Sequence, residues 1–415
     1  GPAEGALRGY LAPWGVMMVA HPWVGILFAA LYASKALAET ARPVVGVWAH
    51  PSDSSDPACG GSCEMVSASY VKWLESAGAR SIPIPYNATP AEMEDIISSV
   101  NGILFPGGSP GPSLAAGWAV SRAIELNEAG DYFPVWGTCL GWEWLAEIIS
   151  GDGDILTDSF DAENMSQPLG LLPNATDSRM FQGLPEWLLD AAGTEALAMN
   201  EHHFGVRPAD FYASDALRDF FSVFSTNKDR QGWPYVSSAE AKHYPIYGVQ
   251  WHPEKNNFEW GETEGGLPYQ AINHSPRAIR LSQEMANFFV SEVRKNGHRF
   301  SSAQAEQAAL FSSRSSYPGS RGTMQKYFFT WEGGVATAGA TGPGDEPGAD
   351  GGFYVTDATT GTSGAPGISR GADDCAGRPD CYSAAGVDGH TLDVEEQEVV
   401  EEADGEVRGT FVEEE

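Results

Sequence analysis

The stretch FPVWGTCLGW, residues 133–142, decides the fold of this chain. Its first four residues are apolar and suit a β-strand, whereas Leu140–Ser150 carries apolar residues at helical spacing. A sharp strand-to-helix turn must lie between them, and Gly137 and Gly141 supply the small residues that such a turn requires. The pattern G-x-C-x-G is the cysteine form of the nucleophile elbow. We therefore predict that Cys139 is a nucleophile at a helix N-terminus, where the macrodipole favours the thiolate.

A buried, inert side chain is the simplest alternative for a lone cysteine, because free cysteine behaves as a small hydrophobe in most proteins. The turn around Cys139 favours the catalytic interpretation, since an elbow lifts one side chain out of the backbone.

Strands and helices alternate on both sides of this turn. The predicted strands are Val44–Trp48 and Gly102–Phe105 with residues 81–85, 133–136, 221–226 and 244–251, and the predicted helices are Leu140–Ser150 with residues 66–77, 90–100, 118–129 and 276–295. Regular alternation with continuous apolar strands predicts an α/β fold, a three-layer αβα sandwich around a mostly parallel sheet. Ligands of such a sheet bind at the carboxyl ends of its strands.

The other groups that a thiol hydrolase needs also follow predicted strands. His252 is held in extended backbone by Pro253 and can act as acid and base. Glu254 lies on the same side if the extended path continues, and it can orient the imidazole. The backbone N–H groups of Leu140 and Gly108 would stabilise the oxyanion. Each motif alone is a common loop, but together they predict a catalytic site that needs no metal or other cofactor.

The composition restricts the partners of this chain. Its 415 residues carry a formal net charge of −32 at pH 7, which argues against nucleic acid or an anionic membrane surface as the main partner. Much of this charge lies in residues 393–415, where only Arg408 opposes the acidic side chains.

The two ends differ from the middle of the chain. Residues 1–38 contain a long apolar run that ends in a small-x-small pattern, which predicts a secretory signal, with an uncleaved membrane anchor as the alternative. We assign residues 39–300 to a catalytic domain. Residues 301–415 are rich in Ser, Gly, Ala and Asp, which predicts a largely disordered acidic tail. The aromatic residues 327–331 are the one candidate there for local structure.

The cysteines and the glycosylation motifs agree with a secretory setting. Cys59 and Cys63 form one close pair, Cys375 and Cys381 form another, and Cys139 is left alone. The sequence leaves open whether Cys59 and Cys63 are bonded to each other, because it does not give their Cα separation. Asn-x-Ser/Thr motifs occur outside the predicted strands at Asn87, Asn164, Asn174 and Asn273.

Five segments together resemble one family. They are ASYVKWLESAGAR (68–80), NGILFPGGS (101–109), DYFPVWGTCLGWE (131–143), SRMF (178–181) and YPIYGVQWHPEK (244–255). The chain resembles the class I glutamine amidotransferase-like fold, and within it gamma-glutamyl hydrolase, over residues 42–300. The resemblance implies Cys139 as the nucleophile, His252 as its base and Glu254 as the third member. It also implies that Glu143, Gly107 and one histidine of Asn200-Glu201-His202-His203 line the substrate cleft, and we choose His202.

This resemblance implies hydrolysis of γ-glutamyl bonds in poly-γ-glutamyl small molecules such as folylpolyglutamates. The predicted signal fits a hydrolase of the vacuole, the lysosome or the extracellular space. A homodimer is left open, and so is a membrane partner if residues 1–38 form an anchor. A glutamine-hydrolysing amidotransferase is a rival, but those enzymes usually have Gln where this chain has Glu143. A pseudoenzyme or binding module is the rival that is not an enzyme.

Two further expectations concern substrate binding. An anionic substrate needs local bases in so acidic a protein, and we name Arg179 and Arg207 as candidates. The family usually has tyrosines where this chain has Cys63-Glu64-Met65, so an aromatic contact to the substrate is absent or replaced.

Overall fold

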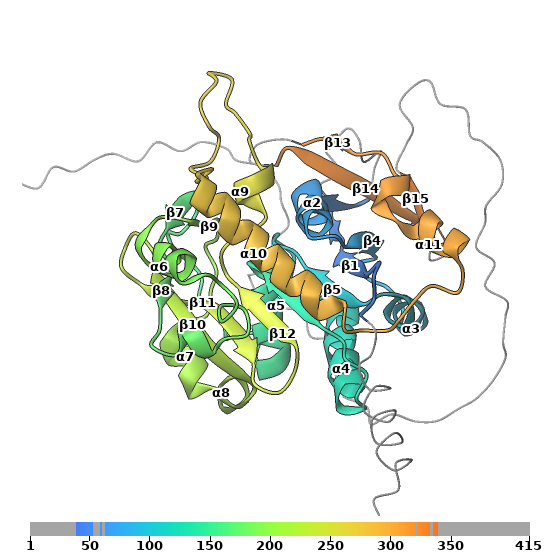
Figure 1. The fold of residues 1–415 in the computed structure, drawn as a ribbon, viewed down its shortest axis with the longest axis horizontal. Coiled ribbons are helices and arrows are strands. Elements are labelled where there is room, and N and C mark those ends of the chain that lie inside the picture. Colours follow the sequence, from blue (N-terminus) through green and yellow to red (C-terminus); the bar gives the residue numbers. More distant parts are fainter. Residues whose placement is uncertain (1–38, 53–58, 60–62, 320–322, 333–334, 339–415) are drawn as a thin grey trace, which may run out of the picture. The chain divides into compact units, whose positions relative to one another are not determined.

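The computed structural model describes residues 39–52, 59, 63–319, 323–332 and 335–338 (Figure 1). Its centre is an eight-stranded sheet in which the first five strands run parallel and the last three antiparallel. In spatial order the strands are β4 (Arg80–Ile84), β1 (Val44–Trp48), β5 (Gly102–Phe105), β6 (Val135–Thr138), β12 (Ile246–Val249), β11 (Pro234–Ala241), β10 (Phe221–Lys228) and β8 (Gly170–Leu171).

Helices cover both faces of this sheet, as the alternation of elements predicts. Successive residues of β1 enter two separate apolar cores: Val44 and Trp48 belong to one, and Val45 and Val47 to the other. The first core is closed by α3 (Pro90–Ser99), α4 (Leu114–Glu128), α5 (Leu140–Ser150), α7 (Pro208–Ala213) and α8 (Asp215–Phe220), and the second by α2 (Ala68–Ser76), α6 (Glu186–Thr194) and α10 (Pro276–Val293). Figure 1 shows α10 lying across the sheet. The three-layer αβα architecture is therefore confirmed.

Several element bounds differ from those expected. The helix predicted to start at residue 66 starts at Ala68, because the preceding residues form the short strand β3 (Glu64–Ser67). The helix predicted from residue 118 starts at Leu114, where the Ser113 side chain accepts a hydrogen bond from the N–H of Ala116. Strand β11 was not predicted, because its sequence PYVSSAEA is polar although most of it is buried. Hydrophobic periodicity does not detect such a strand.

Further elements lie outside the main sheet. They are β2 (His50–Pro51), β7 (Met165–Gln167), β9 (Ala198–Asn200), α9 (Lys255–Phe258), α11 (Ala303–Ala309), β13 (Tyr317–Pro318), β14 (Gln325–Glu332) and β15 (Val335–Ala338), with 3-10 turns at Ala175–Asp177 and Phe311–Ser313. Within a second sheet, β14 pairs antiparallel with β3, and β3 pairs with β2.

Helices and strands therefore continue beyond residue 300, the end predicted for the catalytic domain. Local structure at the aromatic residues 327–331 is confirmed, because they form most of β14. Phe328 and Phe329 of this strand are buried. Composition alone does not predict this strand, because the residues around it are of low complexity. The predicted disordered tail from residue 339 onward lies outside the described residues.

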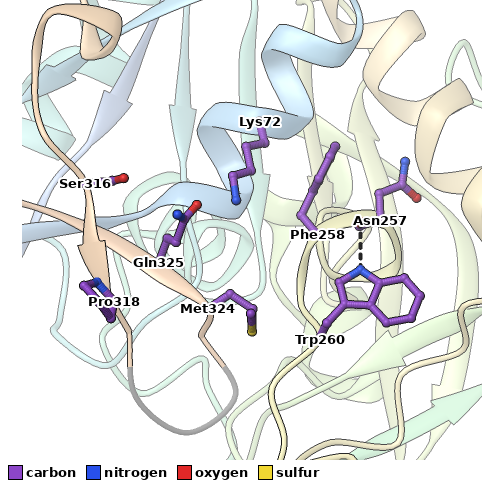
Figure 2. A pocket seen from close by; sticks show the side chains of 8 residues that line it. All are labelled: Lys72, Asn257, Phe258, Trp260, Ser316, Pro318, Met324 and Gln325. Carbon is purple, nitrogen blue, oxygen red and sulfur yellow. Dashed lines mark hydrogen bonds between the residues drawn. The ribbon is translucent and has the colours of Figure 1, made fainter.

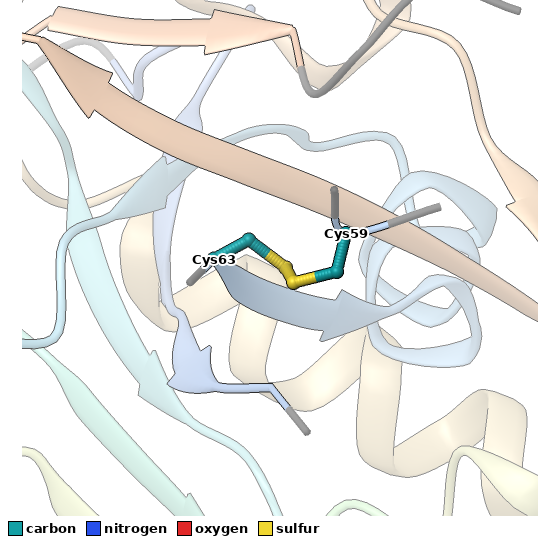
Figure 3. The surroundings of a disulfide bond; sticks show 2 residues. All are labelled: Cys59 and Cys63. Carbon is teal, nitrogen blue, oxygen red and sulfur yellow. A yellow bond between two sulfur atoms is a disulfide. The ribbon is translucent and has the colours of Figure 1, made fainter. Parts of the chain in front are cut away.

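Cys59 and Cys63 form a disulfide beside the start of β3, with a Cα–Cα distance of 5.5 Å (Figure 3). Cys139 is free and buried. Cys375, Cys381 and the predicted signal at residues 1–38 lie outside the described residues. Among the described residues, no helix is both long enough and apolar enough to cross a membrane.

Candidate active site

Cys139 occupies the turn between β6 and α5 in a backbone conformation that ordinary residues rarely adopt, with φ 51° and ψ −111°. Its N–H donates to the carbonyl of Val249 on β12 at 2.7 Å, which fixes the turn to the neighbouring strand. A Cβ at Gly137 would lie 2.5 Å from the Gly141 oxygen, and one at Gly141 would lie 2.7 Å from the carbonyl carbon of Phe105. Both glycines are therefore required by close approach of the backbone.

His252 and Glu254 lie just beyond the end of β12, next to β6 in the sheet. His252 Nδ1 is 2.7 Å from Glu254 Oε1, and both side chains are buried. The chain does not continue extended to Glu254, as the sequence argument assumed, because Glu254 has helical φ and ψ and caps α9. The two side chains meet through this turn. Within the described residues, His252 Nε2 has no hydrogen-bond partner.

Gly107 follows β5, which is the neighbour of β6 on the side opposite β12. Side chains from several parts of the site approach this glycine. A Cβ built on Gly107 would lie 2.7 Å from His252 Cε1, 2.8 Å from the Tyr70 hydroxyl and 3.4 Å from Cys139 Cβ. The cysteine and the histidine therefore surround one glycine at the carboxyl ends of three adjacent parallel strands, β5, β6 and β12. This is the edge at which the sequence argument placed the site.

Tyr70 of α2 is a member of this site that the sequence argument missed, although it lies in the segment ASYVK. Its hydroxyl accepts a hydrogen bond from Gly107 N–H at 2.8 Å and is 3.4 Å from His252 Nδ1. Burial raises the pKa of Tyr70 well above its usual range, and the charges of Glu254 and Cys139 add to this effect. The phenol is therefore neutral.

The predicted oxyanion donors are the N–H groups of Gly108 and Leu140, and neither is bonded to Tyr70 as the Gly107 N–H is. Gly108 N–H makes no hydrogen bond within the described residues. Leu140 is the first residue of α5, and its N–H hydrogen-bonds to Cys139 and lowers the pKa of that thiol. Gly108 approaches Leu140, because a Cβ on Gly108 would lie 3.4 Å from Leu140 Cδ2.

The resting thiol is nevertheless protonated, contrary to the expectation from the helix N-terminus. Burial raises the pKa of Cys139 well above its usual range, and the charge of Glu143 raises it further. The contribution of the helix end through Leu140 is smaller. The Cys139 thiol is directed at the carbonyl of Glu201, with Sγ 3.7 Å from that oxygen.

Glu143 and Gln250 lie beside the thiol. Gln250 Nε2 donates to Glu143 Oε1 at 2.7 Å and lies 3.8 Å from Cys139 Sγ. Burial raises the pKa of Glu143 to about 7, and the Glu147 charge adds to this rise.

Comparison with known proteins agrees with this geometry. The family model described as Peptidase C26 matches residues 43–254. Gamma-glutamyl hydrolase 1 of Arabidopsis thaliana is 38% identical over 306 residues, which cover 70% of this chain and 83% of that protein.

This chain belongs to the peptidase C26 family. The human gamma-glutamyl hydrolase is 41% identical over 250 residues, 59% of this chain and 76% of the human protein, and the mouse enzyme is 42% identical over the same shares. The resemblance to gamma-glutamyl hydrolase is thereby confirmed. Among solved structures, the glutaminase domain of Trypanosoma brucei CTPS with bound acivicin aligns with a TM-score of 0.38 at 15% identity, covering 62% of this chain and 95% of that chain.

The two histidines proposed for the cleft of this C26 protein have different surroundings. His202 is buried, its Nδ1 is 2.7 Å from the Phe204 carbonyl, and its ring meets Tyr235 edge-on at 4.6 Å. Burial lowers the pKa of His202 to about 3, and the nearby His252 adds to this lowering. His203 is exposed and lies 3.3 Å from Glu163. His202 therefore lies near His252.

Arg179 and Arg207, the candidate substrate-binding bases named from the sequence, each contact other residues of the protein. Arg179 is held by Glu240 at 3.2 Å and by the Tyr244 carbonyl at 3.0 Å, so it is a structural residue rather than a substrate contact. Arg207 stacks over the ring of Trp233 at 4.7 Å. Lys255, which directly follows Glu254, was missed although it lies in the HPEK segment. It is buried, donates to Gln270 at 2.9 Å, and its charge lowers the pKa of Cys139.

One pocket of the described structure lies away from the predicted catalytic residues. A pocket of about 620 Å³ lies between α2, α9 and the β13–β14 segment, and none of the predicted catalytic residues lines it (Figure 2). Its lining side chains are Lys72, Asn257, Phe258, Trp260, Ser316, Pro318, Met324 and Gln325. Among the described residues, no group of three or more His, Cys, Asp and Glu side chains is placed to hold a metal ion.

Glu64, the middle residue of the Cys63-Glu64-Met65 segment, has a structural role. Its Oε2 accepts hydrogen bonds from Tyr86 N–H at 2.9 Å and from Trp331 Nε1 at 2.7 Å. It therefore ties β3 to β14.

Proposed function

We propose that this C26 protein hydrolyses γ-glutamyl bonds in poly-γ-glutamyl chains, including folylpolyglutamates, through a thioester at Cys139. The observation that carries the proposal is the meeting of Cys139, His252 and Tyr70 around Gly107, with Glu254 2.7 Å from the imidazole. The family membership and the gamma-glutamyl hydrolase relatives support the bond that is cleaved.

Acylation starts from the protonated thiol. His252 Nε2 takes the thiol proton while Cys139 Sγ attacks the γ-carbonyl carbon, and Glu254 accepts the Nδ1–H bond of the imidazolium. The carbonyl oxygen becomes an oxyanion that accepts hydrogen bonds from Gly108 N–H and Leu140 N–H. The C–N bond then breaks, His252 returns its proton to the leaving amine, and the γ-glutamyl thioester remains on Cys139.

Deacylation repeats these steps with water. His252 removes a proton from water, the resulting hydroxide attacks the thioester carbonyl, and the same two amides stabilise the second oxyanion. The C–S bond breaks, Cys139 regains its proton from His252, and the γ-carboxyl product leaves.

Substrate binding needs a local cation, because the net charge of −32 repels a polyanion. Lys255 is the charge best placed for it, since it is buried beside the triad and acts on Cys139. Glu143, His202 and Gly107 are the groups that we expect to meet the γ-glutamyl residue.

Incubation with a synthetic pteroylpolyglutamate tests the proposal directly. We expect release of glutamate or short γ-glutamyl peptides and complete loss of release in Cys139→Ala. The matched control is Cys59→Ala with Cys63→Ala, which removes two cysteines outside the site and should retain cleavage. Full activity in Cys139→Ala would eliminate the mechanism.

The same samples separate the rival functions. Free ammonia from glutamine without cleavage of γ-glutamyl chains would identify a glutaminase instead. A pseudoenzyme would cleave neither, and its Cys139 would react with iodoacetamide at the same low-pH rate with and without His252.

We further propose that residues 1–38 direct the chain to the secretory pathway and from there to a vacuole, a lysosome or the exterior. The Cys59–Cys63 disulfide supports this, because such bonds persist in oxidising compartments. Microscopy of the chain fused at its C-terminus to a fluorescent protein, compared with a chain lacking residues 1–38, tests the proposal. Equal cytosolic fluorescence from both would contradict it.

A further inference from the structure

His50 lies against the turn that carries the Gly108 amide, and the mechanism above does not use it. It belongs to β2, directly beyond the end of β1, and its side chain is 3% exposed. A Cβ on Gly108 would collide with His50 Nδ1 and would lie 2.6 Å from Cε1. The Nδ1–Cε1 edge of the ring therefore occupies the space in which every residue other than glycine carries its side chain.

The ring is fixed from its other side by α5. His50 packs on Trp144 with ring centroids 5.2 Å apart, and Trp144 is itself held by a hydrogen bond from Nε1 to the Pro110 carbonyl at 2.9 Å. Phe105, at the end of β5, meets Trp144 edge-on at 5.7 Å. His50 thus lies between the catalytic helix and the glycine turn.

The His50 ring fills this space although it leaves one buried polar atom without a partner in the described part of the chain. Among the described residues, His50 Nε2 is a buried polar atom without a hydrogen-bond partner. Such an atom costs roughly 1–3 kcal/mol, which an apolar side chain of similar size would avoid. Burial also lowers the pKa of His50 to about 3, so the ring is neutral and adds no charge to the site.

The turn is constrained from two sides. On the Gly107 side, Tyr70 accepts the amide hydrogen, so that N–H is not available to a substrate. On the Gly108 side, the neighbours are His50 and Leu140, and the Gly108 amide has no partner within the described residues. Glycine has wide backbone freedom, and an amide without a partner can rotate unless its neighbours prevent it.

We propose that His50 is a positioning residue of the oxyanion hole, which holds the Gly108 N–H towards the acyl oxygen by filling the space beside Gly108 Cα. The inference rests on the proposed acyl transfer at Cys139. The amide is needed when the oxyanion forms, so loss of His50 affects the transition state more than substrate binding.

Steady-state cleavage of a γ-glutamyl substrate by His50→Ala measures this difference. Removing one oxyanion donor typically lowers kcat by about 100- to 1000-fold. In His50→Ala the Gly108 N–H is still present but no longer held in place, so we expect kcat to fall by about tenfold to 100-fold. KM should stay within about threefold of the value for the unmodified protein. His50→Asn fills part of the same space and should recover part of kcat. His298→Ala removes another partly buried histidine, one bonded to Asp131 and Ile97, and should retain kcat.

Two reactions of Cys139 with small probes separate positioning from general damage. The Cys139 thiol adds to the aldehyde carbonyl of glutarate semialdehyde. The new C–S bond gives a hemithioacetal whose oxygen occupies the oxyanion hole. Its affinity should fall in His50→Ala by the same factor as kcat. Alkylation by iodoacetamide displaces iodide and develops no oxyanion, so its rate should be unchanged.

A double-mutant cycle tests the contact itself. Gly108→Ala places a methyl group on the His50 ring, whereas in the His50→Ala background that space is free. Gly108→Ala should therefore lower kcat in both backgrounds, but by different factors. We expect the factor in the unmodified protein to be at least about ten times larger than the factor in the His50→Ala background. Thermal unfolding of each variant shows whether it is folded.

Three results would overturn the inference while the proposed function stands: unchanged kcat in His50→Ala, a fall in the alkylation rate equal to the fall in kcat, or strictly additive effects in the cycle. If the unmodified protein cleaves no γ-glutamyl bond, the proposed function fails and the inference fails with it.

Discussion

Glu254 Oε1 lies 2.7 Å from His252 Nδ1, and the pair is shielded from solvent. We expect this contact to fix the tautomer in which Nε2 can accept the Cys139 proton. Glu254→Gln keeps the shape but offers an amide that can present its NH₂ group to Nδ1, which favours the wrong tautomer. We expect kcat to fall by about 100- to 10,000-fold with little change in KM. Steady-state kinetics measure this. A change of less than threefold would remove Glu254 from the catalytic set.

We expect the charge of Glu143 to slow the reactions of the thiol above pH 7. Its charge raises the pKa of Cys139, and its own pKa is raised to about 7 by burial. Below that pH Glu143 is neutral and has no such effect. Glu143→Gln should therefore react with iodoacetamide about three to ten times faster than the unmodified protein at pH 8, and at the same rate at pH 5. The charges of Glu254 and Lys255 also act on Cys139 and are the same in both proteins. Equal rates at pH 8 would show that the Glu143 charge does not reach the sulfur.

The raised pKa of Glu143 should stabilise the fold at acidic pH, and this contribution should be lost towards neutral pH. A carboxyl whose pKa rises on folding binds its proton more tightly in the folded state, so folding is favoured below the unfolded pKa near 4.5 and loses this contribution as pH rises to about 7. Glu143 alone contributes at most roughly 3 kcal/mol over that interval. Glu147, whose pKa burial also raises to about 7, has the same sign and is more exposed.

Chemical denaturation at pH 5 and pH 7 measures this contribution. In Glu143→Gln the difference in unfolding free energy between the two pH values should shrink. Asp152→Asn is a matched control, because it removes an exposed carboxyl of the turn that follows α5. The expectation fails if Glu143→Gln and Asp152→Asn give the same pH dependence as the unmodified protein.

The glycosylation motifs at Asn87 and Asn273 should differ in occupancy. Asn87 is exposed and its side chain makes no hydrogen bond within the described residues. Asn273 donates from Nδ2, the atom that would carry the sugar, to the Ala196 carbonyl at 2.7 Å, and its Oδ1 accepts from Ser275 N–H at 2.8 Å. We expect Asn87 to carry a glycan and Asn273 to be bare. Glycopeptide mass spectrometry of secreted protein, with Asn87→Gln as the control, measures both, and a fully occupied Asn273 would contradict the expectation.

The part of the site that is local in the chain was predictable. Gly137 and Gly141 identify the elbow from a few neighbouring residues, and Pro253 marks the end of the strand that carries His252. Parallel strands bring such ends to one edge, so Cys139, His252 and Gly107 could be grouped before any distance was known.

The contacts made across the fold were not predictable in this way. Tyr70 lies on a helix face with other buried apolar residues, and nothing in its neighbours indicates that its hydroxyl meets Gly107. His50 is one histidine at the end of a strand, and its contact with Gly108 depends on how two loops pack. The charge balance at Cys139 was misjudged because burial, which outweighs the helix end, is a property of the assembled fold.

The pairing of β14 with β3 links the end of the folded chain to its beginning. The partners of β3 are β2, which includes His50, and β14, and β3 is followed directly by α2, which carries Tyr70. During synthesis the ribosome makes β3 more than two hundred residues before β14. Until then, one edge of β3 lacks its partner and is open to pairing with other chains. The sheet that contains His50 is therefore completed late in translation, and a ribosome that stalls shortly after α10 would display β3 with one edge open to other chains.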